Sequence, residues 1–122
     1  MNENIGTEGK YYGKYRGTVI NNLDPEFTGR LLVMVPDVTS LTPSSWAVPC
    51  VPLAGPTGPP MGVYMVPPIG AGVWVEFEQG DLDYPIWSGC FWGENEAPES
   101  SPDVKVLKTD VGTITINDKK DS

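Results

Sequence analysis

The stretch "GVWVEFEQGDLDYPIWSG", residues 72–89, contains the most regular strand pattern of the chain. In its first half Val73, Val75 and Phe77 alternate with other residues, and this period of two places all three on one face of an extended strand. The second half begins with Tyr84 and Pro85, and a strand tolerates proline at its start. Glycine and aspartate between the halves are typical of a turn. The stretch therefore predicts two strands joined by a turn.

Shorter strands are predicted elsewhere, from runs of β-branched, aromatic and aliphatic residues bounded by turn-forming residues. They cover residues 14–22, 30–36, 45–51, 62–67 and 111–118. Nine prolines lie between residues 36 and 72, and because proline breaks a helix, a continuous helix is excluded there. We predict an all-β fold, a small five- to six-stranded barrel with long Pro-rich loops and a C-terminal extension strand.

A chain of 122 residues is the size of one ordinary domain. We expect a flexible polar arm over residues 1–12, the barrel over 13–93, an acidic linker over 94–104 and a C-terminal strand segment over 105–122. No apolar run is long enough for a secretory signal or a membrane span. We therefore expect neither a signal peptide nor stable membrane insertion.

The formal net charge of −8 is unevenly distributed. Residues 31–104 contain no lysine or arginine but hold nine acidic residues. Such a surface repels phosphate backbones and anionic lipids. Nucleic acid is therefore an unfavoured partner, and a nucleic-acid-binding barrel that stacks bases on Trp74, Trp87 and Trp92 is a weak alternative because it also needs a cationic groove.

The chain contains no histidine, which removes the commonest general base and a common metal ligand. Cys50 and Cys90 are too few for a structural zinc site. Without an export signal, we expect two buried free thiols rather than a disulfide. No cofactor and no metal site is predicted.

Carboxylates are the remaining candidates for chemistry. Glu76 and Glu78 are predicted on one strand face about 7 Å apart, a separation that an inverting glycosidase uses. Because the core residues point the other way, nothing in the pattern raises one pKa above the other. Asp81 and Asp83 lack the other ligands of a calcium loop and are better explained as turn residues. A carbohydrate-active or carbohydrate-binding module that uses Glu76, Glu78 and nearby tryptophans stays an alternative.

Over about residues 15–93 the sequence resembles the phage baseplate assembly protein V family, the oligonucleotide/oligosaccharide-binding (OB) domain of contractile-tail spikes. The resemblance rests on the order and spacing of many short motifs rather than on any one of them. The matching residues are Gly17, Thr18, Val19, Asp24, Pro25, Gly29, Arg30, Trp46, Ala54, Gly55, Pro67, Gly70, Val73, Phe77, Gly80, Asp81, Pro85 and Gly89. The resemblance implies an OB-fold barrel.

The resemblance also implies a structural, non-enzymatic role. Family members form homotrimers in the baseplates of phage tails and injection particles, between the hub or tail tube and a membrane-puncturing tip, and would be assembled in the bacterial cytoplasm. Many continue into a triple-stranded β-helix, and "VGTITIND", residues 111–118, looks like the start of one.

Surplus apolar residues are the expected subunit contacts: Tyr64, Met65, Trp74, Trp87, Trp92, Ile114 and Ile116. We also expect Arg30 to pair with Asp24 across its loop.

Overall fold

Strand β4 (Gly72–Phe77) lies at the centre of a five-stranded sheet in the computed structural model, with the strand order β2-β1-β4-β5-β3. The alternation predicted from the sequence is present, because Val73, Val75 and Phe77 are buried while the residues between them are half-buried. β4 pairs antiparallel with β1 on one side and with β5 on the other. The most regular sequence pattern thus forms the middle of the sheet.

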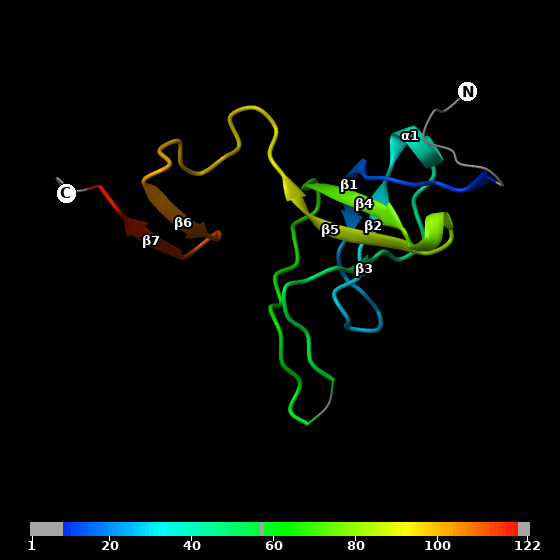
Figure 1. Cartoon of the computed structure of the whole chain (residues 1–122), viewed down its shortest axis with the longest axis horizontal. Helices are drawn as coiled ribbons and strands as arrows, with labels where there is room; N and C mark the ends of the chain where they lie inside the picture. The colour runs from blue at the N-terminus through cyan, green and yellow to red at the C-terminus, as the bar shows by residue number, and fades with distance from the viewer. Residues whose placement is uncertain (1–8, 57, 120–122) are drawn as a thin grey trace. The chain divides into compact units, whose positions relative to one another are not determined.

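The structure describes residues 9–56 and 58–119 and divides into two units, residues 1–91 and residues 92–122. The first unit holds β1 (Tyr15–Asn21), β2 (Leu32–Met34), α1 (Pro36–Thr39), β3 (Val48–Pro49), β4 (Gly72–Phe77), the 3-10 turn η2 (Glu78–Gly80) and β5 (Pro85–Phe91) (Figure 1). The second unit holds β6 (Val104–Lys108) and β7 (Thr113–Asn117), an antiparallel pair. None of the described helices is long and apolar enough to cross a membrane.

The five-stranded sheet curls until its two edges meet. β3 pairs parallel with β5, and the residue just before β3, Ala47, exchanges two backbone hydrogen bonds with Leu31, just before β2, at N···O distances of 3.0 and 2.7 Å. This contact joins the two edges of the sheet. The all-β OB-fold barrel predicted from the sequence is confirmed.

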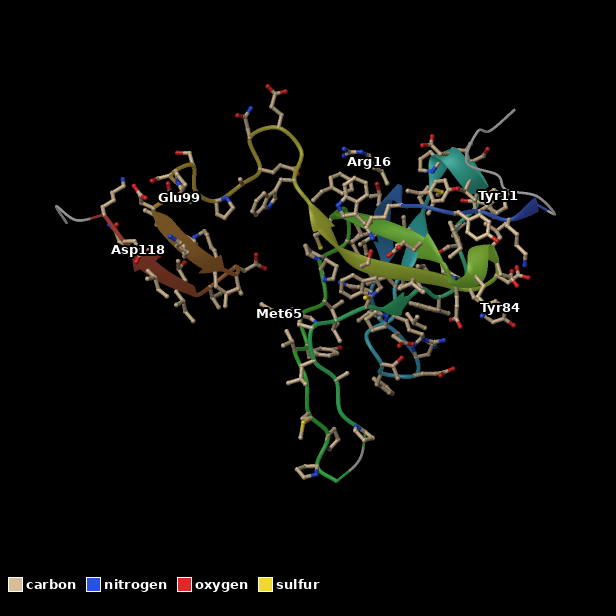
Figure 2. The ribbon with its side chains drawn as sticks, viewed as in Figure 1. Tyr11, Arg16, Met65, Tyr84, Glu99 and Asp118 are labelled. Carbon is tan, nitrogen blue, oxygen red and sulfur yellow. The ribbon has the colours of Figure 1, made fainter. Side chains whose placement is uncertain are left out.

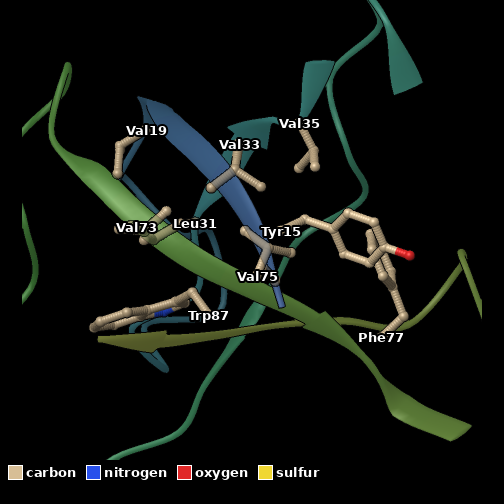
Figure 3. Close-up of a cluster of buried hydrophobic side chains, with 10 residues drawn as sticks. Tyr15, Val19, Leu31, Val33, Val35, Val73, Val75, Phe77 and Trp87 are labelled. Atoms are coloured by element: carbon tan, nitrogen blue, oxygen red, sulfur yellow. The ribbon is translucent and has the colours of Figure 1, made fainter. Parts of the chain in front are cut away.

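A small apolar core fills the barrel (Figure 3). Its buried members are Tyr15, Val19, Leu31, Val33, Val35, Ala47, Val73, Val75, Phe77 and Trp87. Gly17 on β1 allows the strands to approach closely, because a Cβ there would lie 2.9 Å from a methyl group of Val75 and 3.3 Å from the carbonyl oxygen of Met34. The glycine is therefore required by packing rather than by its backbone angles.

Two of the predicted strand assignments differ from the structure. The predicted strand at 62–67 is absent, and only a single β-bridge joins Gly62 to Ala54, because the surrounding prolines lack the N–H groups of a ladder. In the C-terminal region one strand was expected, but β6 pairs with β7 to form a two-stranded sheet. β6 alternates valine with lysine or leucine over only five residues, a signal too short to stand out after a polar linker.

The predicted flexible arm, residues 1–12, lies mostly outside the described residues. Its last part is ordered, because the backbone N–H of Tyr11 donates to the carbonyl of Gly80 at 2.8 Å. The Tyr11 ring also packs 6.1 Å from that of Phe77. The chain is therefore attached to the barrel from Tyr11 onward.

Cys50 and Cys90 are free thiols, but both are exposed rather than buried as predicted. Cys90 lies on β5 directly after Gly89, where the pairing with β4 shifts register. Partial desolvation still raises the pKa of the Cys90 thiol. Their positions at strand ends, which the sequence did not indicate, explain the exposure.

Leu31 is fully buried at the contact that closes the barrel. We expect Leu31→Ala to reduce the free energy of unfolding by about 2–5 kcal/mol, since it removes buried methyl groups and leaves a cavity. The exposed Leu41 provides the matched control, and Leu41→Ala should change the free energy of unfolding by less than about 0.5 kcal/mol. Urea unfolding followed by tryptophan fluorescence measures both, and equal effects would contradict this account of the core.

Candidate functional site

The acidic residues after β4 do not form the carboxylate pair predicted from the sequence. The strand ends at Phe77, and Glu78 begins the 3-10 turn instead of continuing the alternation. Gln79 and Gly80 adopt left-handed backbone angles, φ 53° and 78°, which an extended strand excludes. The prediction that Glu76 and Glu78 share one strand face is therefore wrong.

The charge state of Glu76 also differs from what a sugar-cleaving acid needs. Lys14 on the neighbouring chain segment lies 2.9 Å from its carboxylate, and this ammonium holds the pKa of Glu76 below its usual range. A general acid needs a raised pKa. Glu76 is thus an ion-pair partner on the outside of the sheet.

Asp81 and Asp83 belong to the turn that leads into β5. The side chain of Asp81 accepts a hydrogen bond from the N–H of Asp83 at 3.0 Å, and its carbonyl accepts one from the N–H of Tyr84 at 3.0 Å. The turn explanation holds for both residues. Within residues 9–56 and 58–119, no group of three or more Cys, Asp or Glu side chains is placed to hold a metal ion.

The buried carboxylate of Asp24 organises the loop between β1 and β2. Its Oδ2 accepts hydrogen bonds from the N–H and the hydroxyl of Thr28, at 2.9 and 2.7 Å, and from the N–H of Arg30 at 3.2 Å. Its Oδ1 accepts from the N–H of Glu26 at 2.9 Å and from Nε and Nη2 of Arg30 at 3.1 and 2.8 Å. The predicted pairing of Arg30 with Asp24 is confirmed.

The Arg30 guanidinium and the other donors hold the pKa of Asp24 well below its usual range. Arg30 in turn lies 5.6 Å from the Trp46 ring and 3.3 Å from Glu26. The side chains of Asp24 and Arg30 are little exposed, so solvent screens this ion pair less than a surface pair. The loop is therefore rigid for a segment outside the sheet.

This rigid loop presents two apolar side chains to solvent. Phe27 is 88% exposed and has a left-handed φ of 58°, and Leu23 is similarly exposed. Neither residue was a predicted contact. Their signal in the sequence is only that large apolar residues flank an Asp-Pro turn, where polar residues are usual.

A second exposed apolar feature is the segment from residue 51 to residue 66, which extends from the barrel between β3 and β4 (Figure 1). From here on, the arm means this segment and not the N-terminal residues 1–12. Backbone hydrogen bonds cross its described part, from the N–H of Gly55 to the carbonyl of Met61 at 2.8 Å and from the N–H of Val63 to the carbonyl of Leu53 at 2.9 Å. Its exposed large side chains are Leu53, Met61, Val63, Tyr64 and Met65; Met65 is labelled in Figure 2. No charged residue occurs between Asp37 and Glu76, so the arm is wholly uncharged.

The arm and the Asp24 loop share a surface. A Cβ at Gly29 would lie 3.7 Å from the Tyr64 ring, and Tyr64 also borders a hollow with Leu23 and Phe27. Leu23, Phe27 and Tyr64 therefore belong to one exposed apolar surface. Tyr64 and Met65 were predicted as contacts and are exposed.

The barrel tryptophans have different environments. Trp87 is buried, and its Nε1–H donates to the carbonyl of Gly29 at 2.9 Å, so it is a core residue and not the exposed apolar side chain that was expected. It lies two residues after the buried Pro85, on the inward face of β5. Trp74 is half-buried and packs 5.0 Å from the Phe91 ring. The Arg16 guanidinium lies over both rings, at 4.8 and 4.6 Å from their centroids (Figure 2).

Other residues of the predicted motifs fix the approach to β4 and the shape of β5. The carbonyl of Pro67 accepts a hydrogen bond from Nδ2 of Asn22 at 3.1 Å. Gly70, at φ 94°, donates its N–H to the carbonyl of Val19 at 2.8 Å. Gly89, at φ 97°, lies where β5 shifts register against β4. These positions shape the backbone.

The two-stranded sheet of the second unit has one covered and one open face. Trp92, Pro98, Val104 and Val106 line the same hollow, so one face is partly covered from within the unit. Across the strands Leu107 pairs with Ile114, and directly opposed residues share a face. Lys105 opposes Ile116 in the same way. The open face therefore carries Lys105 beside three exposed apolar side chains, Leu107, Ile114 and Ile116.

The curled five-stranded sheet with its joined edges defines the first unit as an OB domain. A family model described as the type VI secretion system/phage-baseplate injector OB domain matches residues 15–92. The chain belongs to this family. Among curated proteins, none matches the chain.

We expect Asp24→Asn to weaken the loop without unfolding the barrel. Amide hydrogen exchange should accelerate at Thr28 and Arg30, whose N–H groups bond to the Asp24 carboxylate. Arg30→Ala should have a similar effect. Unchanged protection at these amides in both variants would contradict the role assigned to the carboxylate.

The same pair predicts a pH dependence. Because the folded pKa of Asp24 is lowered, its contribution to stability is complete above the pKa of an unfolded aspartate, about 4, and is lost as the pH falls toward the folded value. The difference in urea midpoint between wild type and Asp24→Asn should be constant from about pH 8 to about pH 5 and shrink below about pH 4. A difference that grows on acidification would have the wrong sign.

Proposed function

We propose that the chain is a structural component of a contractile-tail or injection-particle baseplate and acts as a homotrimer. It links the hub or tail tube to a membrane-puncturing tip protein. The family membership supports the baseplate role. The trimer is supported by one observation above all, the open apolar face of the β6–β7 sheet.

An isolated two-stranded hairpin is at best marginally stable in water. Ile114 and Ile116 are 62% and 59% exposed, and a second layer must cover them to gain the stabilisation of apolar burial. Three copies around an axis bring three such faces together. Cyclic closure then leaves no face open, which a linear array does not achieve.

A force-transmitting role needs rigidity and no chemistry. The Asp24 network stiffens one loop, and the edges of the barrel sheet are joined. The carboxylates examined as catalytic candidates are an ion pair and a turn. We therefore assign no enzymatic activity, no nucleic-acid partner and no membrane insertion, and place the protein in the particle, after assembly in the bacterial cytoplasm.

Light scattering after size exclusion tests the trimer. At micromolar concentration the wild type should have three times the chain mass of 13.2 kDa. Ile114→Asp with Ile116→Asp should shift the protein toward the monomer, because charges would be buried unpaired between the copies. Val111→Asp, in the exposed loop between the strands, is the matched control and should leave the trimer intact. A clean wild-type monomer would contradict the proposal.

A further inference from the structure

Phe27 combines two features that are unfavourable for an isolated chain. A large aromatic side chain is 88% exposed, and its backbone adopts a left-handed conformation, φ 58°, that is uncommon outside glycine, asparagine and aspartate. Such an outlier persists where the surrounding structure enforces it, and it often marks a functional position. Here the Asp24 carboxylate bonds to Glu26 and Thr28 on both sides of Phe27.

The loop therefore holds the backbone of Phe27 in one conformation, with the aromatic ring exposed. Aromatic residues are enriched among those that dominate binding energy, and fixing them before binding reduces the entropy lost on association. Phe27 thus has the properties of a preformed anchor.

A groove that could bind such an aromatic side chain lies on the same unit. A groove of about 350 Å³ runs between the arm and the barrel, a size within the range of pockets that bind small ligands. Its apolar walls include Pro49, Val51, Leu53, Met61, Met65 and Trp87. Methionine side chains adapt to the shape of a partner, so two of these residues can close around an aromatic ring.

Charge indicates what occupies the groove. The chain carries a net charge of −8, so two copies repel each other wherever their carboxylates face. Among the described residues, no charged side chain lines the groove, and in the Asp24 loop Arg30 offsets one of the two acids, at 2.8 Å from Asp24 and 3.3 Å from Glu26. A basic partner would gain nothing from the uncharged groove, whereas an identical acidic chain meets no like charge there.

We infer that Phe27 of one copy inserts into the groove beside the arm of a second copy. Anchor and groove are present on every chain, so each copy both gives and receives the contact. This inference rests on the proposed homo-oligomer, and it assigns the barrel unit a self-contact of its own, separate from the β6–β7 sheet.

Phe27→Asn tests the inference without threatening the fold. Asparagine tolerates the left-handed conformation better than phenylalanine, so at a concentration where both proteins are dissociated the thermal midpoint should stay the same or rise. Self-association, measured by analytical ultracentrifugation, should weaken by at least about tenfold if Phe27 is an anchor. Leu41→Asn is the matched control, since Leu41 is 89% exposed and lies in a different loop, and it should change neither quantity. Unchanged self-association of Phe27→Asn would overturn the inference.

A photo-crosslinking residue at position 27 identifies the contact directly. In a mixture of unlabelled and ¹⁵N-labelled full-length protein, crosslinks between differently labelled chains should map to residues 51–66. Crosslinks confined to one chain, or to other segments, would overturn the inference. A wild-type trimer with such a result would leave the proposed function standing. The opposite result is also informative. Crosslinks from position 27 to residues 51–66 of another chain, together with a wild-type protein that is not a trimer, would support the contact and refute the proposed trimer.

Discussion

The loop between β1 and β2 depends on the carboxylate of Asp24. It takes the place of water for donors that the sheet does not pair, including three backbone N–H groups. It also fixes the guanidinium of Arg30, which packs near the Trp46 ring. Burying a charge is unfavourable unless it is paired and hydrogen-bonded, and here every donor comes from within six residues. One side chain thus holds together a connection that has no ladder of its own.

Charge and apolar surface are separated along the chain. The acidic residues lie outside residues 38–75, and that segment supplies the arm and its exposed side chains. In the second unit the open face of β6–β7 carries Leu107, Ile114 and Ile116, and Lys105 on that face pairs with Asp118 at 2.7 Å. Both units therefore combine charged groups, which favour solubility, with restricted areas where another protein can dock.

The sequence predicted features that depend on local pattern. The alternation around Val75 predicted strand β4 and its buried face correctly, because in a strand every second side chain lies on the same face. The loss of alternation at Glu78 was not predictable in the same way, since it depends on Gln79 adopting a left-handed conformation that its type does not favour. Trp87 was misassigned because burial of a tryptophan depends on the barrel around it. Phe27 was missed because exposure of an apolar residue is a property of the folded loop.

The arm also affects how the barrel forms. β1 pairs with β4, for example Gly17 with Val73, so the chain must close a long loop containing the arm before the central strands meet. The entropy of closing a loop grows only with the logarithm of its length, about 0.6 kcal/mol for each doubling. Lengthening the arm would therefore change barrel stability little, although non-local pairing makes folding slow. The length of the arm is therefore set by its contacts rather than by the stability of the barrel.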